Sequence, residues 1–154
     1  MCAGVSGGRI VLWHYLQGNW NGGKAADLYN GPIYDALVKH RGLKRGYRIL
    51  EDNDPTGYKS SKALAAKAAK GITTIDFPRY SPELNPLDFS LWDEILRRMN
   101  KSEPNGVENL SQYKKRLRLT ALRLPERVVR AAVAAIRERA AMVVRAGGKN
   151  IKRD

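Results

Sequence analysis

Two aspartates, Asp52 and Asp88, stand where a carboxylate can take part in chemistry. Asp52 follows the apolar run "YRILE" (47–51), which predicts a strand, and side chains at a strand end converge on a cleft. Asp88 falls in the first turn of a helix predicted from about residue 87 to 99. Mg²⁺ prefers oxygen ligands, commonly one or two carboxylates completed by phosphate and water. The two aspartates therefore indicate a divalent-metal site for phosphodiester chemistry.

The same residues also have a structural interpretation. Asp52 and Asp54 can cap a turn, and Asp88 can cap a helix, because a carboxylate accepts hydrogen bonds from unpaired backbone N–H groups. The spacing alone leaves the metal site and the caps as open alternatives.

The elements that must position these aspartates alternate between strands and helices, which predicts an α/β fold. Pro32 either kinks the first helix or marks its true start. Pro78, Pro82 and Pro86 stiffen the loop that precedes Asp88. Strands are predicted over 9–16, 47–51 and 72–75, and helices over 25–40, 59–70, 87–99, 107–119 and from Pro125 to about Arg145.

The composition bounds the class of protein. The chain has 154 residues, 43% hydrophobic and 28% charged, which suits one globular domain. A net charge of +13 favours polyanions, nucleic acid ahead of an anionic membrane surface. The sequence contains neither an apolar run of about 18 residues nor a signal peptide. With the single Cys2, these features predict a reducing compartment: the nucleus in a eukaryote, otherwise the cytoplasm.

The positive charge is concentrated toward the C-terminus. Residues 101–154 contain 14 of the 28 basic residues but only 5 of the 15 acidic ones. The long helix predicted there has an apolar face formed by Val129, Ala132, Val133, Ile136, Ala140 and Val143. A neighbouring stripe consists of Arg127, Arg130, Arg137 and Arg145. This arginine stripe is either an ordinary solvated face or a ridge that contacts nucleic-acid phosphates.

Two motifs, "DNDP" (52–55) and "FPRYSPELNPLDFSLW" (77–92), resemble the catalytic core of mariner-type transposases of the DDE superfamily. The upstream "GGRIVLWHYLQGNWNGG" and the downstream "LPERVVRAAVAAIRERAAMVVRAGG" are similar to flanking parts of that core, so the resemblance covers nearly the whole chain. It implies a ribonuclease H-like mixed sheet flanked by helices. It also matches Asp52 to the second catalytic acid and Asp88 to the third, with 35 residues between them.

The resemblance implies an activity and its partners. In the intact family the activity is metal-dependent cleavage and strand transfer of DNA at transposon ends, with Mg²⁺ or Mn²⁺ as the cofactor. Asp52 and Asp88 are then the metal ligands, and the arginine stripe is the candidate DNA contact. A homodimer is left open, and no membrane association is expected.

The chain departs from the family pattern in two places. "TGYKSS" (56–61) stands where the family has a His-containing segment. No acidic residue precedes Asp27, so the family's first catalytic Asp has no counterpart. We therefore expect an N-terminally truncated core that lacks the first strand and binds its metal weakly, with Asp54 as the nearest substitute ligand.

These features predict one domain, with a partial catalytic core over 1–100 and a basic helical part over 101–154. Three functions remain open. The chain is a transposase or DDE endonuclease fragment, a non-catalytic DNA-binding remnant or repurposed domain, or an unselected fragment that folds poorly.

Overall fold

The computed structural model describes residues 1–78, 80–102, 104, 106–149 and 151. The chain forms two compact units, one of Met1–Gly4 and Val11–Tyr80, and the other of Val5–Ile10 and Ser81–Asp154. The expected mixed α/β class is confirmed, because the described residues contain both helices and small sheets. The expected single domain with parts over 1–100 and 101–154 stays a prediction.

Two short strands form a hairpin, β1 (Cys2–Ser6) and β2 (Arg9–His14). Gly7 and Gly8 make the turn with φ of +58° and +81°, a backbone conformation that favours glycine. β2 confirms the strand predicted over 9–16, although it ends at His14. β1 was not predicted, because "CAGVS" has one β-branched residue among small ones.

The helix predicted over 25–40 is two helices, α1 (Gly22–Asn30) and α2 (Pro32–Arg41). Pro32 lies in the first turn of α2, where the missing N–H is not needed, so it starts a helix and does not kink one. The Asn21 side chain caps α1 by accepting a backbone N–H of its first turn at 3.1 Å.

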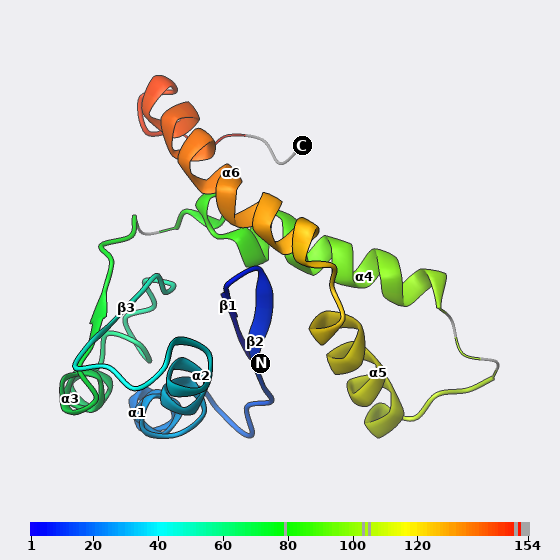
Figure 1. Ribbon diagram of the computed structural model, residues 1–154, viewed down its shortest axis with the longest axis horizontal. Helices are drawn as coiled ribbons and strands as arrows, with labels where there is room; N and C mark the ends of the chain where they lie inside the picture. The colour runs from blue at the N-terminus through cyan, green and yellow to red at the C-terminus, as the bar shows by residue number, and fades with distance from the viewer. Residues whose placement is uncertain (79, 103, 105, 150, 152–154) are drawn as a thin grey trace. The chain divides into compact units, whose positions relative to one another are not determined.

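A parallel βαβ arrangement completes the first unit. β3 (Tyr47–Ile49) pairs with β4 (Ile72–Thr74), and α3 (Ser61–Ala69) connects them (Figure 1). Both strands are shorter than the predicted runs 47–51 and 72–75, so the residues that follow β3 form a loop. α1 packs against α2 and α3. The buried core of this unit consists of Ala25, Tyr29, Tyr47, Ala63, Ala66 and Ile72.

The second unit is mainly helical. A 3₁₀ turn and one turn of π-helix lead into the first of three α-helices. Among the described residues, no helix is both long enough and apolar enough to cross a bilayer. Leu91, Ile95 and Val129 are the largest fully buried side chains of this unit. These elements are the 3₁₀ turn Pro82–Leu84, the π-helical turn Leu87–Leu91, α4 (Trp92–Lys101), α5 (Leu110–Leu122) and α6 (Glu126–Arg145).

The apolar face predicted for α6 is partly wrong. Val129 and Ala132 are buried as expected, but Val133 is 41% exposed. Arg139 is instead buried, with 7% of its surface exposed. It lies seven residues, or about two helical turns, beyond Ala132, so both side chains share one face of α6.

Candidate functional site

The loop after β3 carries Asp52 at the carboxyl end of the parallel strand pair. Its side chain is exposed, and Oδ1 accepts the Asn53 N–H at 2.8 Å. Asn53 Nδ2 donates to the Phe77 carbonyl oxygen at 2.9 Å, in the loop that follows β4. Asn53 therefore ties together the two loops that leave the strands. Asp52 lies where open α/β sheets bind their ligands, outside the carboxyl ends of parallel strands.

Asp54 has a structural role. Its carboxylate accepts hydrogen bonds from Trp20 Nε1 at 2.7 Å, Gly57 N at 2.7 Å and Thr56 Oγ1 at 2.9 Å. Burial raises the pKa of Asp54, but the hydrogen bonds from Trp20, Thr56 and Gly57 outweigh burial and hold this pKa below its usual value. A carboxylate that is engaged in this way does not suit the role of substitute metal ligand. The capping interpretation is correct for Asp54.

Gly57 and Tyr58, which depart from the family motif, belong to an aromatic cluster. Trp20 lies against Gly57 so closely that an added Cβ would come within 2.2 Å of the indole ring. The Tyr58 ring contacts Trp20 edge to face with centroids 5.0 Å apart, and Tyr29 with centroids 6.2 Å apart. Packing against Trp20 therefore requires glycine at position 57.

Asp88 lies in the π-helical turn that continues as α4. The Asn85 carbonyl oxygen accepts the N–H groups of Asp88 at 2.9 Å and Phe89 at 3.0 Å, and the Asn85 side chain accepts the Leu87 N–H at 3.1 Å. Asn85 thus shapes the start of the helix, and the Asp88 side chain is half-buried. Single π-helical turns are rare and frequently occur at functional sites. This geometry suits the predicted role of Asp88.

Arg139, which the arginine stripe did not include, supports the segment that carries Asp88. Its Nε donates to the Glu83 carbonyl oxygen at 2.6 Å, and its guanidinium lies 4.5 Å from the centroid of the Phe89 ring. Glu83 lies in the 3₁₀ turn before Asn85, and Phe89 lies in the π-helical turn after it. The sequence marks Arg139 only as a basic residue at an apolar position of the helical pattern.

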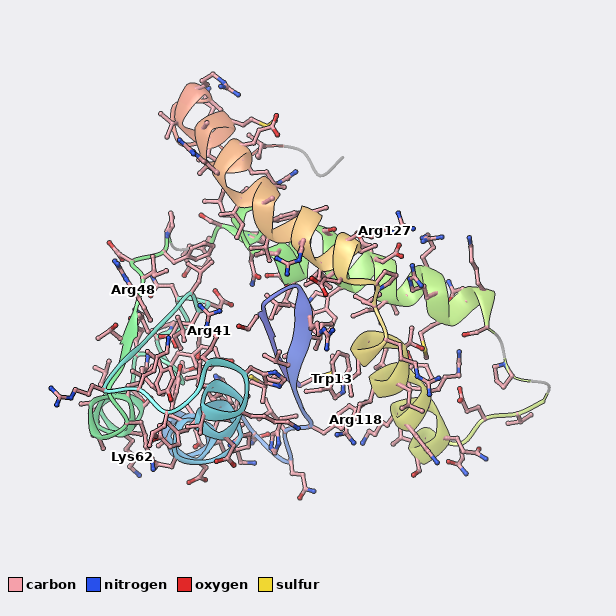
Figure 2. All side chains as sticks on the ribbon, in the orientation of Figure 1. Trp13, Arg41, Arg48, Lys62, Arg118 and Arg127 are labelled. Atoms are coloured by element: carbon pink, nitrogen blue, oxygen red, sulfur yellow. The ribbon has the colours of Figure 1, made fainter. Side chains whose placement is uncertain are left out.

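The arginine stripe lies on the surface of α6. Arg127, Arg130, Arg137 and Arg145 are all exposed, and Figure 2 shows Arg127 projecting from α6 and Arg118 from α5. Arg130 pairs with Glu126 at 2.6 Å, and its hydrogen bond lowers the pKa of Glu126. Within the described residues, the other three arginines have no ion-pair partner. They are therefore available to a polyanion.

Of the two carboxylate oxygens of Asp52, only Oδ1 accepts a hydrogen bond from a described residue. The Asp52 carboxylate can therefore bind a divalent cation through Oδ2. Asp88 belongs to the second unit, so its convergence with Asp52 stays a prediction. In the part of the chain that the structure describes, no group of three or more His, Cys, Asp or Glu side chains is placed to hold a metal ion. The residues present fit a cation that is held by one or two carboxylates and completed by water and phosphate.

Glu51, the residue before Asp52, was not predicted to have a role near the site. Its side chain is buried and pairs with Lys67 of α3, which is buried as well. The signal was a lysine among the alanines that α3 turns toward the core.

Among solved structures, the fold matches that of transposase catalytic domains, which confirms the predicted resemblance at the level of the fold. The first match is the crystal structure of the catalytic domain of Mos1 mariner transposase, with a TM-score of 0.82 and 15% identity over 98% of this chain and 74% of that chain. Two further matches are Mos1 catalytic-domain structures with raltegravir. The structure with Mn has a TM-score of 0.82 and 16% identity, and the structure with Mg has 0.75 and 15%, each over 98% of this chain and 76% of that chain. No protein-family model and no curated protein matches the sequence.

Proposed function

We propose that this chain is a transposase-like domain that acts on DNA phosphodiesters, with Asp52 and Asp88 as its metal-binding carboxylates. The observation that carries the proposal is the position of Asp52, which is exposed at the carboxyl end of β3 in a fold that matches the Mos1 catalytic domain. The proline-rich motif adds Asp88, with 35 residues between the two aspartates.

Each residue has a defined part in this function. Asp52 and Asp88 supply negative charge to a divalent cation and leave its other positions to water and DNA phosphate. Asn53 keeps Asp52 at the strand ends, because it holds the loop after β3 against the loop after β4. A bound Mg²⁺ or Mn²⁺ supplies Lewis-acid stabilisation of the charge that develops at phosphorus. Structures of the Mos1 catalytic domain with Mn and with Mg support this choice of cation.

DNA binding in this proposal is electrostatic and weakly dependent on sequence. The net charge of +13 and the exposed arginine stripe favour the phosphate backbone. Because Arg130 is already paired with Glu126, Arg127 and Arg137 are the better residues to test. Replacing both with glutamine should weaken duplex DNA binding and reduce the slope of log affinity against log salt by about 2.

The measurement is fluorescence anisotropy with a labelled DNA duplex between about 50 and 200 mM salt. The matched control is Lys44→Gln with Lys62→Gln, which removes the same charge from exposed positions of the first unit. Equal losses in the two double variants would show that only the net charge matters. Unchanged binding in the arginine variant would return the stripe to an ordinary solvated face.

A non-catalytic DNA-binding domain is the second candidate function. It is favoured by the described residues' lack of a group of three or more potential ligands for a metal ion. Divalent-dependent nicking of plasmid DNA separates the two functions, because only the first predicts any product that depends on Asp52 and Asp88.

A further inference from the structure

Three polar side chains meet inside the first unit, in a core that is otherwise apolar and aromatic. The Lys67 ammonium and the Tyr29 hydroxyl donate to different oxygens of the Glu51 carboxylate. The side chains of Lys67 and Glu51 are only 4% and 7% exposed, and Lys67 Nζ lies 4.8 Å from the centroid of the Tyr29 ring. Burial and the hydrogen bond to Glu51 raise the pKa of Tyr29, so its hydroxyl keeps the proton that it donates.

This buried cluster is a poor device for stability. Removing two charges from water is unfavourable, and apolar residues of similar volume often replace a buried ion pair without loss. Its neighbours Ala25, Ala63 and Ala66 are apolar, so apolar side chains in place of the three polar ones would have extended the same core. The cluster does, however, attach one point of the chain to two helices at once, α1 through Tyr29 and α3 through Lys67.

That point is the residue before Asp52. Successive side chains of a strand point to opposite sides. Although β3 ends before them, the alternation of exposed and buried side chains continues over Leu50, Glu51 and Asp52, so a Glu51 side chain held in the interior leaves Asp52 directed outward. The observed burial follows this alternation, because Glu51 is buried and Asp52 is exposed. On the other side of Asp52, Asn53 is held by its hydrogen bond to the Phe77 carbonyl oxygen. Asp52 is therefore anchored through both of its neighbours.

Glu51 itself is not available as a metal ligand, since one of its oxygens accepts from Tyr29 and the other from Lys67.

We propose that Tyr29 and Lys67, acting through Glu51, are positioning residues that fix the direction of the Asp52 carboxylate and thereby set its affinity for a divalent cation. The cation part of this inference rests on the proposed function, in which Asp52 is a metal ligand. Groups that hydrogen-bond a metal ligand directly typically change metal affinity by about 10- to 100-fold, and we expect the lower end of this range because Tyr29 and Lys67 act through Glu51.

The test uses two NMR measurements on the ¹⁵N-labelled full chain. Without metal, hydrogen exchange of the Asn53 amide reports the loop, because this N–H donates to Asp52 Oδ1. With added Mn²⁺, paramagnetic broadening of the same amide reports binding at Asp52. Tyr29→Phe removes only the hydroxyl, and Tyr34→Phe is the matched control, since no described residue hydrogen-bonds the Tyr34 hydroxyl. The double variant Glu51→Gln with Lys67→Met removes both charges while keeping similar volumes.

Tyr29→Phe and the double variant should accelerate hydrogen exchange of the Asn53 amide several-fold. They should also raise the Mn²⁺ concentration at half-maximal broadening, the Mn²⁺ midpoint, by about tenfold. Tyr34→Phe should leave both quantities unchanged. Unchanged Asn53 exchange in both test variants would overturn the positioning role, whatever the chain does with metal. Faster exchange with an unchanged Mn²⁺ midpoint would overturn the link between positioning and cation affinity. Wild-type chain that shows no Mn²⁺ broadening at Asn53 would overturn the metal role of Asp52, and the exchange data would still decide whether the cluster orients it.

Discussion

Replacing Asp54 with alanine should lower the free energy of unfolding by about 2 kcal/mol. The carboxylate accepts hydrogen bonds from Trp20 Nε1 and Gly57 N, both at 2.7 Å, and from Thr56. A hydrogen bond to a charged group contributes about 1.5–3 kcal/mol when it is protected from water, but Asp54 is half-exposed and water replaces part of each loss. About 1 kcal/mol for each of the two short bonds, and little for the exposed Thr56, gives this magnitude.

Urea unfolding followed by far-UV circular dichroism measures the change in the free energy of unfolding. In thermal unfolding, the Tm should fall by about 4–8 °C. Asp52→Ala is the matched control, because Asp52 is exposed and accepts only the N–H of its own neighbour among the described residues. Its effect on stability should stay within about 0.5 kcal/mol. If Asp54→Ala and Asp52→Ala were equally stable, the conclusion that Asp54 is structural and Asp52 is not would be refuted.

The contribution of Asp54 also depends on pH. Its folded-state pKa is lowered, so the ionised carboxylate stabilises the fold above its usual pKa, and this contribution is lost as the pH falls through the lowered value. The difference in unfolding free energy between the wild type and Asp54→Ala should therefore close as the pH falls below the usual pKa of an aspartate and through the lowered one. A difference that persists at the acidic end would show that the charge of the carboxylate is not its cause.

The chain alone should nick supercoiled plasmid slowly or not at all in Mg²⁺ or Mn²⁺, because two carboxylates hold a cation weakly and stabilise little charge at phosphorus. Robust nicking that Asp52→Asn or Asp88→Asn abolishes would contradict weak cation binding. Slow nicking that either variant abolishes would support the proposed function, and no nicking that depends on these residues would favour the non-catalytic DNA-binding domain. Gly57→Ala should displace the neighbouring indole ring, lowering the Tm and shifting tryptophan emission, and an unchanged emission spectrum would argue against the observed packing. In urea titrations, Arg139→Met should lower the free energy of unfolding by about 2 kcal/mol, because the Glu83 carbonyl loses a charged donor. Arg137→Met, on the exposed side of α6, should change this free energy by less than about 0.5 kcal/mol.

Local patterns in the sequence predicted most of the elements in their order, but neither β1 nor the division of residues 25–40 into α1 and α2. The strand Arg9–His14, the parallel strands around α3 and the helices of the second unit all follow from periodicity, caps and prolines, which act over a few residues. The sequence also places Asp52 directly beyond a strand. Element ends were less accurate, since β3 and β4 stop short of their apolar runs.

The tertiary structure decided which polar residues are structural. Asp52 and Asp54 are the same residue type two positions apart, and residue type and periodicity do not distinguish them. Trp20, 34 residues away from Asp54, makes the difference, because its indole N–H binds Asp54.

The buried cations follow the same rule. Lys67 meets Glu51 across 16 residues, and Arg139 meets Glu83 across 56. In the sequence, each is one of 28 basic residues in a strongly cationic chain. Residue type and periodicity determined where the chain forms helices and strands. Burial of a charge, in contrast, depends on a partner that only the packing of distant segments brings within hydrogen-bonding distance.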